Sequence, residues 1–229
     1  MNRRFYTPQI PPVGDDVELS QDEGHHLRSV LRAREGEDIE LLDGCGAQAQ
    51  AQITRLPAGK GRTVCCTIQS RRRLPRPTPR VTLCIAPPRG KLMRQIVRQA
   101  TELGVYAVQP VLCERSESRP RASACRQWQA SAVEACKQSG NAFLPICHPP
   151  ADLAGLLAAG VGPGYVGCVP DAGADTGAAP VLVEGEDVTL WIGPEGGFHP
   201  DELQLLLRAG LTPVTFGPWT LRTVTAAVA

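Results

Sequence analysis

The sequence predicts two domains of different class, a small antiparallel β domain followed by an α/β domain with a mainly parallel sheet. Short β-like runs separated by Gly, Asp and Pro fill the N-terminal part. A proline-rich segment follows, and beyond it strand patterns alternate with helix patterns. With 229 residues and 42% hydrophobic content, the chain can bury an ordinary core, which excludes disorder along its whole length.

The first domain is predicted over residues 1–70. Its β-like runs, typical of a small sheet or barrel, are residues 17–19, 38–42, 48–54 and 63–69. One short helix is expected between the first two runs, where Leu27, Val30 and Leu31 recur at helical spacing. Residues 71–79 contain three prolines, which block both helix and central strand, so we interpret this segment as a linker.

The second domain is predicted over residues 80–229. Its expected strands are residues 81–86, 105–111, 144–147, 165–169, 187–192 and 214–216. Its expected helices are residues 92–103, 125–139, 200–207 and 221 onward. The apolar face of the first helix would comprise Leu92, Ile96, Ala100 and Leu103. Residues 158–185, rich in Gly and Ala, are expected to form loops of low local stability.

The composition argues against several classes of protein. No run approaches the roughly 20 apolar residues that span a bilayer, and the N-terminus lacks a signal-peptide pattern, so we expect a cytoplasmic protein without a membrane segment. Nine cysteines without any C-x-x-C spacing predict reduced, mostly buried thiols. Because no Cys lies at a ligand spacing from a His, no metal site is expected.

Charge is strongly segregated along the chain although its formal net value is only +1. Residues 60–126 hold fifteen Lys or Arg against three acids, whereas residues 150–229 hold two Arg against nine acids. A basic belt rich in Arg is typical of a surface that binds nucleic acid, because the guanidinium fork matches phosphates and base edges. The alternative is a solvated surface that reflects a GC-rich coding bias.

Two glycine-containing segments carry the strongest functional signal. Residues 191–198 read WIGPEGGF and residues 216–227 read FGPWTLRTVTAA, each after a predicted strand and before a predicted helix. Ligands of open α/β sheets bind at such loops, where glycine lets the backbone approach closely. The spacing matches neither a dinucleotide fingerprint nor a P-loop. Taken singly, each segment could be an ordinary βα loop; together they predict a pocket.

These segments resemble the RsmE family of 16S rRNA uracil-N3 methyltransferases. The resemblance also includes the ATELGV stretch at residues 100–105 with Pro110, and the segment 134–145 with its KQSG stretch. Near the N-terminus it includes RFY at residues 4–6 and HHL at residues 25–27, followed by VLR at residues 30–32. The motifs run in the family's order over essentially the whole chain. Each motif alone is weak, but together they are specific.

The resemblance implies a SPOUT methyltransferase with a PUA-like N-terminal β-barrel and a C-terminal α/β domain tied in a trefoil knot. It implies a homodimer that acts on 16S ribosomal RNA of the small ribosomal subunit. S-adenosyl-L-methionine would be held largely by backbone groups of the knot loops. The cofactor-binding positions carried over are Ile192, Gly193, Pro194, Gly196, Gly197, Phe216, Gly217 and Leu221.

Arg222 is the residue that we expect to be catalytic. Methyl transfer to N3 develops negative charge on the uracil as its proton leaves, and a guanidinium can stabilise that charge. A structural role for Arg222 is the alternative. The backbone geometry of the loops requires neither the side chain of Glu195 nor that of Arg222. Both side chains are therefore candidates for contact with the substrate. The sequence departs from the family at Val224, where a Glu is usual, so that position bears on activity.

RNA contacts are predicted on both domains. Lys91, Arg94 and Arg98 form one helical stripe within the basic belt, where phosphate contact competes with a plain solvated face. His25 and His26 suit stacking on unpaired bases, or else a capping or core role. The remaining candidates in the N-terminal motifs are Arg4 and Arg28.

Two other functions fit the same sequence. One is a catalytically lapsed RNA-binding or ribosome-assembly protein, which Val224 would favour. The other is a methyltransferase of the same fold that acts on a different RNA.

Overall fold

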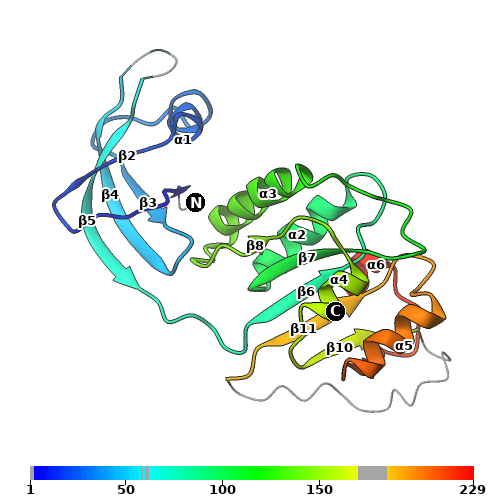
Figure 1. Cartoon of the computed structure of the whole chain (residues 1–229). Coiled ribbons are helices and arrows are strands. Elements are labelled where there is room, and N and C mark those ends of the chain that lie inside the picture. Colours follow the sequence, from blue (N-terminus) through cyan, green and yellow to red (C-terminus); the bar gives the residue numbers. More distant parts are fainter. Residues whose placement is uncertain (1–2, 58, 60–61, 170–184) are drawn as a thin grey trace. The chain divides into compact units, whose positions relative to one another are not determined.

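The computed structural model describes residues 3–57, 59, 62–169 and 185–229 (Figure 1). The chain divides into two compact units. The first comprises Met1–Arg76 with Val133–Leu144, and the second comprises Pro77–Ala132 with Pro145–Ala229. The sequence predicted two consecutive domains. This prediction is wrong for residues 133–144, which lie within the predicted second domain but belong to the first unit.

The first unit contains a five-stranded sheet in the order β1-β3-β4-β5-β2. Its strands are β1 (Arg4–Tyr6), β2 (Asp16–Glu18), β3 (Asp38–Leu42), β4 (Ala47–Arg55) and β5 (Cys65–Arg73). Only β1 and β3 pair in parallel; the other neighbours are antiparallel. In β4 the residues Ala47, Ala49, Ala51 and Ile53 are buried, the two-residue period of a strand with one face in the core; on the other face Gln50 is exposed and Gln48 is buried.

The predicted linker begins too early. Strand β5 continues through Arg73, three residues into the segment 71–79, because it pairs with β4 as far as Ala47. Strand β1 was not predicted, since three residues that pair with a distant strand leave no periodic pattern of their own. The four predicted runs of this region overlap β2, β3, β4 and β5.

The helix predicted in the first unit is present and spans α1 (Gln21–His25) and the π-helical turn η1 (His26–Val30). The side chain of Ser20 caps α1 by accepting a hydrogen bond from the Glu23 N–H at 3.3 Å. Leu27 is fully buried in the core, whereas Val30 is exposed. The π-helical turn is wider than an α-helical turn, so residues at α-helical spacing do not all share one face.

Ion pairs join the segment Val133–Leu144 to the rest of the first unit. The Lys137 ammonium donates to Glu23 Oε1 at 2.9 Å and lies 2.7 Å from Glu134 Oε1. Burial acts to lower the pKa of Lys137, but its hydrogen bonds to Glu134 and Glu23 outweigh burial and raise that pKa. Arg4 pairs with Glu40 at 2.8 Å and donates to the Gln138 carbonyl at 3.1 Å. These side chains are therefore part of the first unit's framework.

The second unit contains a parallel sheet in the order β12-β10-β11-β6-β7-β8, with β9 pairing with β7. Its strands are β6 (Val81–Ile85), β7 (Ala107–Leu112), β8 (Ile146–Cys147), β9 (Ala151–Asp152), β10 (Gly164–Gly167), β11 (Val188–Ile192) and β12 (Thr212–Val214). Every pairing in this sheet is parallel, which confirms the expected α/β class. The buried Trp191 and Val166 are among its core side chains.

The helices of the chain beyond residue 90 are α2 (Leu92–Glu102), α3 (Ala124–Ser139), α4 (Leu153–Ala158), α5 (Pro200–Arg208) and α6 (Thr223–Ala226). The buried face of α2 comprises Met93, Ile96, Val97, Ala100 and Thr101. Leu92 and Leu103 were wrongly assigned to it. They lie at the two ends of the helix and are 41% and 69% exposed. Among the described residues, no helix has the length and apolar content for a membrane span.

Part of the Gly- and Ala-rich segment 158–185 lies outside the described residues. Its described part contains the end of α4 and all of β10. The predicted helix from residue 221 begins instead at Thr223, because Arg222 has extended backbone angles and forms the N-cap of α6. The thiols are free, and most of the cysteines are buried, as predicted.

Candidate functional site

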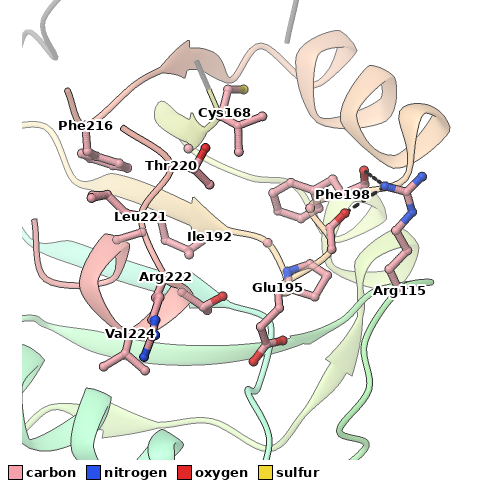
Figure 2. A pocket seen from close by; sticks show the side chains of 18 of the residues that line it. Arg115, Cys168, Ile192, Glu195, Phe198, Phe216, Thr220, Leu221, Arg222 and Val224 are labelled. Atoms are coloured by element: carbon pink, nitrogen blue, oxygen red, sulfur yellow. Dashed lines mark hydrogen bonds between the residues drawn. The ribbon is translucent and has the colours of Figure 1, made fainter. Parts of the chain in front are cut away.

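A cavity of about 580 Å³ lies in the second unit at the carboxyl ends of β10, β11 and β12 (Figure 2). Its walls come from the loops that follow these three neighbouring strands, with Arg115 and Leu92 contributing from elsewhere in the unit. The volume falls within the range of about 300–1,000 Å³ that is usual for small-molecule sites. The two glycine segments predicted to form a pocket do meet there.

The loop after β11 forms a tight turn at the cavity. The Gly197 N–H donates to the Pro194 carbonyl at 2.8 Å, which closes the turn with Glu195 and Gly196 at its tip. Gly197 has a φ of 69°, which favours glycine. The Arg115 guanidinium donates to the carbonyl of Gly196 at 2.9 Å and to that of Phe198 at 3.4 Å (Figure 2). Arg115, which lies in a different loop, therefore holds the backbone of the turn in place.

The helix that follows this loop is also anchored. His199 is the N-cap of α5 and forms a capping box with Glu202. The second carboxylate oxygen of Glu202 accepts a hydrogen bond from the Glu114 N–H at 2.7 Å, so Glu202 links α5 to the loop that carries Arg115. The acids at the start of α5 thus have structural partners. This arrangement holds the glycine turn between β11 and α5.

The loop after β12 supplies the opposite side of the cavity. Phe216, Trp219 and the residues from Thr220 to Val224 line it. Gly217, which was predicted to bind the cofactor, is not a lining residue; its φ of 100° shows that it serves the turn. Trp219 is 77% exposed although its side chain belongs to the lining. The other predicted cofactor positions all line the cavity.

Sequence reasoning missed the contribution of the loop after β10. Gly167, Cys168 and Val169 line the cavity because β10 lies between β11 and β12, a sheet order that no local pattern reveals. A side chain at Gly167 would meet Ile192 and Phe216, each 3.0 Å from its Cβ. Burial raises the pKa of the Cys168 thiol, so this residue stays protonated at neutral pH. Arg115 was missed because it follows β7 and is joined to the cavity by a hydrogen bond to the distant Gly196 carbonyl.

Only three charged side chains belong to the described lining, namely Arg115, Glu195 and Arg222. The rest of the wall is mostly glycine and apolar or aromatic side chains. Glu195 and Arg222 are exposed, and neither has a side-chain hydrogen bond or ion pair within the part of the chain that the structure describes. Figure 2 shows them extending toward the same side of the pocket from two different loops. The site therefore suits an organic ligand held by backbone groups and apolar contacts, next to one carboxylate and one guanidinium.

The predicted RNA-binding residues of the first unit differ in their surroundings. Arg4 is committed to Glu40 and backbone carbonyls, and Arg28 donates to the Arg62 carbonyl at 2.9 Å. His26 packs against Phe5 edge to face, with 5.9 Å between ring centroids. His25 is exposed and lies 3.2 Å from the Ser29 hydroxyl. Of these four, His25 is the side chain best placed for an external partner.

The predicted basic stripe on α2 is present at the surface of the second unit. Lys91, Arg94 and Arg98 are all exposed. Arg94 hydrogen-bonds to the Gln127 side chain. Lys91 and Arg98 have no side-chain partner among the described residues. Their charges are therefore available to a polyanion.

Comparison with known sequences identifies two family models. An RNA methyltransferase domain matches residues 75–229, and an RNA methyltransferase PUA domain matches residues 19–61. The chain is 34% identical over 217 residues to a ribosomal RNA small subunit methyltransferase E from Synechocystis, covering 92% of this chain and 69% of that protein. It is also 34% identical to the protein of that name from Mycobacterium bovis, covering 97% of this chain and 87% of the relative.

Solved structures of methyltransferases are similar to this chain over its full length. A ribosomal RNA small subunit methyltransferase E from Neisseria gonorrhoeae bound to S-adenosyl methionine is similar with a TM-score of 0.88 and 30% identity. A putative methyltransferase from Legionella pneumophila in complex with the same cofactor is similar with a TM-score of 0.89 and 31% identity. Each match covers 100% of this chain and 94% of the other.

Proposed function

We propose, because the chain belongs to the ribosomal RNA small subunit methyltransferase E family, that it transfers a methyl group from S-adenosylmethionine to N3 of a uridine in 16S ribosomal RNA. The observation that carries this proposal is the cavity at the carboxyl ends of β10, β11 and β12. It has the size of a small-molecule site, and its glycine turns leave backbone groups accessible. The reaction is expected to be that of a SPOUT methyltransferase.

The lining residues fit S-adenosylmethionine. Phe198, Phe216 and Trp219 offer aromatic surface for an adenine ring or for a sulfonium cation. A Cβ at Gly193 would lie 3.0 Å from the Phe198 ring, so glycine keeps this wall from being pushed apart. The residues proposed to hold the cofactor are Ile192, Gly193, Pro194, Gly196, Gly197, Phe216 and Leu221. When bound, this cofactor supplies an electrophilic methyl group.

Arg222 is proposed to act on the uracil. The N3 atom bears a proton at neutral pH, so negative charge develops on the ring and its carbonyl oxygens as that proton leaves. The guanidinium at the edge of the cavity can donate hydrogen bonds to such an oxygen. Arg222 is the N-cap of α6, and its backbone carbonyl accepts hydrogen bonds from the Thr225 and Ala226 N–H groups at 2.8 and 2.9 Å. Its backbone is thereby held in place while its side chain extends into the site.

The partners of the proposed enzyme follow from its charged surfaces. Lys91, Arg94 and Arg98 would contact RNA phosphates, and His25 would contact an unpaired base of the same RNA. The unit of Met1–Arg76 with Val133–Leu144 would act as the PUA-like RNA-binding domain, and the unit of Pro77–Ala132 with Pro145–Ala229 as the knotted catalytic domain. A homodimer in the cytoplasm is the expected state. These assignments rest on exposure and on the family.

A direct test is methylation of small-subunit rRNA from a strain that lacks this gene. Incubation with the purified protein and S-adenosylmethionine should add one methyl group to a uridine, located by mass mapping of nuclease fragments. If the rRNA of the deletion strain is already methylated at that uridine, the substrate assignment is wrong. Methylation of a different RNA would retain the chemistry and change the substrate.

Val224 favours a second candidate, a lapsed enzyme that binds RNA without modifying it. The side chain of Val224 lines the cavity, at the position where the resemblance to the family implies a Glu. Calorimetric titration with S-adenosylhomocysteine separates the two functions. The proposed enzyme binds this product, whereas absence of binding at millimolar ligand would leave only the RNA-binding role.

A further inference from the structure

The proposed reaction needs a group that accepts the N3 proton. A proton acceptor must reach the reacting atom within hydrogen-bond distance and must be unprotonated at neutral pH. Within the described lining there is no His, Lys or Tyr. Among these same residues Glu195 is the only carboxylate.

The other polar lining groups are unsuited to this task. The Cys168 thiol has a raised pKa because it is buried, and the guanidinium of Arg115 is occupied by two carbonyls. Threonine hydroxyls are far too weakly basic, and a guanidinium stays protonated. Position 224, which could have carried a carboxylate into the same cavity, is Val.

Glu195 is presented by a fixed backbone. It lies at the tip of the turn closed between Pro194 and Gly197, and Arg115 holds the carbonyls of Gly196 and Phe198. Its carboxylate has no internal partner within the described residues. Figure 2 shows the side chain pointing away from Arg115, toward the side of the pocket where Arg222 also extends. A rigid turn that carries an unengaged carboxylate is the arrangement that a positioned base requires.

We propose that Glu195 is the catalytic base of the methyl transfer, an inference that rests on the proposed function. As the bond between N3 and the methyl carbon forms, the carbon–sulfur bond breaks and its electron pair stays on sulfur. The Glu195 carboxylate takes the N3 proton, becomes a neutral carboxylic acid, and returns the proton to water after product release. Alkylation makes the N3 proton strongly acidic, so an ordinary carboxylate suffices.

The rate test compares Glu195→Gln with the wild type. Removing the base should lower kcat by about 100-fold, the usual scale of a general base. The affinity for S-adenosylhomocysteine should stay within about twofold, because the cofactor site is backbone-built and the turn is held by Arg115. Asp201→Asn is the matched control: its carboxylate is 84% exposed on α5, outside the lining, and this variant should retain full activity.

A binding test needs no turnover. In the presence of S-adenosylhomocysteine, an rRNA fragment with uridine at the target site should bind about tenfold more tightly than one with 3-methyluridine. This difference arises because only uridine donates its N3–H to the Glu195 carboxylate. Glu195→Ala should bind the two fragments with nearly equal affinity, while Asp201→Asn should keep the tenfold preference.

Three outcomes overturn the inference. They are a Glu195→Gln kcat within threefold of the wild type, a cofactor affinity that falls together with the rate, and a uridine preference that persists in Glu195→Ala. The second would show that Glu195 shapes the turn. A wild-type protein that binds S-adenosylhomocysteine and methylates no rRNA would instead refute the proposed function, so the two failures are distinguishable.

Discussion

The two units use their charged side chains in different ways. In the first unit, Lys137 pairs with Glu23, and Arg4 pairs with Glu40 and donates to the Gln138 carbonyl. The side chains of Lys137 and Glu23 are only 10% and 8% exposed. In the second unit, Glu195 and Arg222 at the cavity and Lys91 and Arg98 on α2 have no internal partner among the described residues. Similar residue types therefore stabilise the framework of the first unit and, at the cavity and on α2 of the second unit, stay available to ligands.

The largest effect is expected from Lys137→Ala. Removing one partner of a buried pair leaves the Glu23 carboxylate uncompensated and should cost about 3–5 kcal/mol of unfolding free energy. Equilibrium urea denaturation measures this loss. The matched change Arg98→Ala removes from α2 an exposed cation that has no partner among the described residues, and it should alter stability by less than about 0.5 kcal/mol. Equal losses in the two variants would refute the contrast between the units.

Arg222→Ala tests the same contrast at the cavity. Loss of a donor aimed at developing charge should lower kcat by about 100-fold. The Arg222 side chain makes no capping bond to α6, so the melting temperature should remain that of the wild type. A stability loss comparable to that of Lys137→Ala would assign Arg222 a structural role. The affinity for S-adenosylhomocysteine, measured by calorimetry, should change little.

Gly196→Val should weaken S-adenosylhomocysteine binding by about tenfold or more, because the added methyl groups would enter the cofactor space. The fold should persist, since among the described residues a Cβ at Gly196 meets only Arg115, at 3.7 Å or beyond. Gly164→Ala provides the opposite case. Its Cβ would lie 2.1 Å from the Thr189 hydroxyl oxygen and 2.4 Å from the Thr189 carbonyl oxygen, so that variant should fail to fold stably. Normal binding by Gly196→Val would remove the turn from the cofactor site.

The smallest effect is expected on the salt dependence of RNA binding. The double variant Lys91→Glu with Arg98→Glu should reduce the slope of log affinity against log salt by about 1.4, on the single-strand scale of about 0.7 per phosphate contact. Arg208→Glu, an exposed change on α5, serves as the control and should leave the slope nearly unchanged. An unchanged slope in the double variant would mean that the α2 stripe is only solvated.

Local patterns predicted the parts of the fold that depend on local sequence. The parallel sheet, the helices α2, α3, α5 and α6 and the two glycine turns follow from periodicity and from residue chemistry, whereas the short helix α4 was not predicted. Local patterns could not predict the features that depend on contacts between distant segments. These features are the pairing of β1 with β3, the place of β10 between β11 and β12, and the membership of residues 133–144 in the first unit. The wall formed by Gly167, Cys168 and Val169 was missed for this reason.

The same distinction applies to single side chains. Arg4, a candidate from an N-terminal motif, and Arg98, a candidate from helical spacing, were both predicted to contact RNA, yet Arg4 is paired with Glu40 and Arg98 is exposed. Leu103 completed a plausible apolar stripe but lies beyond the last turn of α2. The role of a charged or apolar side chain depends on its neighbours in space, and many of these come from distant parts of the sequence.

The exposure of Trp219 has a practical consequence. The other two indoles, Trp128 and Trp191, are 5% and 1% exposed, so aqueous quenchers such as iodide reach chiefly the ring at the cavity mouth. Its emission should shift to shorter wavelength and become shielded from iodide when a ligand covers that ring. Entry of the cofactor and then of RNA can thus be timed by stopped-flow fluorescence on the unlabelled protein, with Trp219→Phe as the blank.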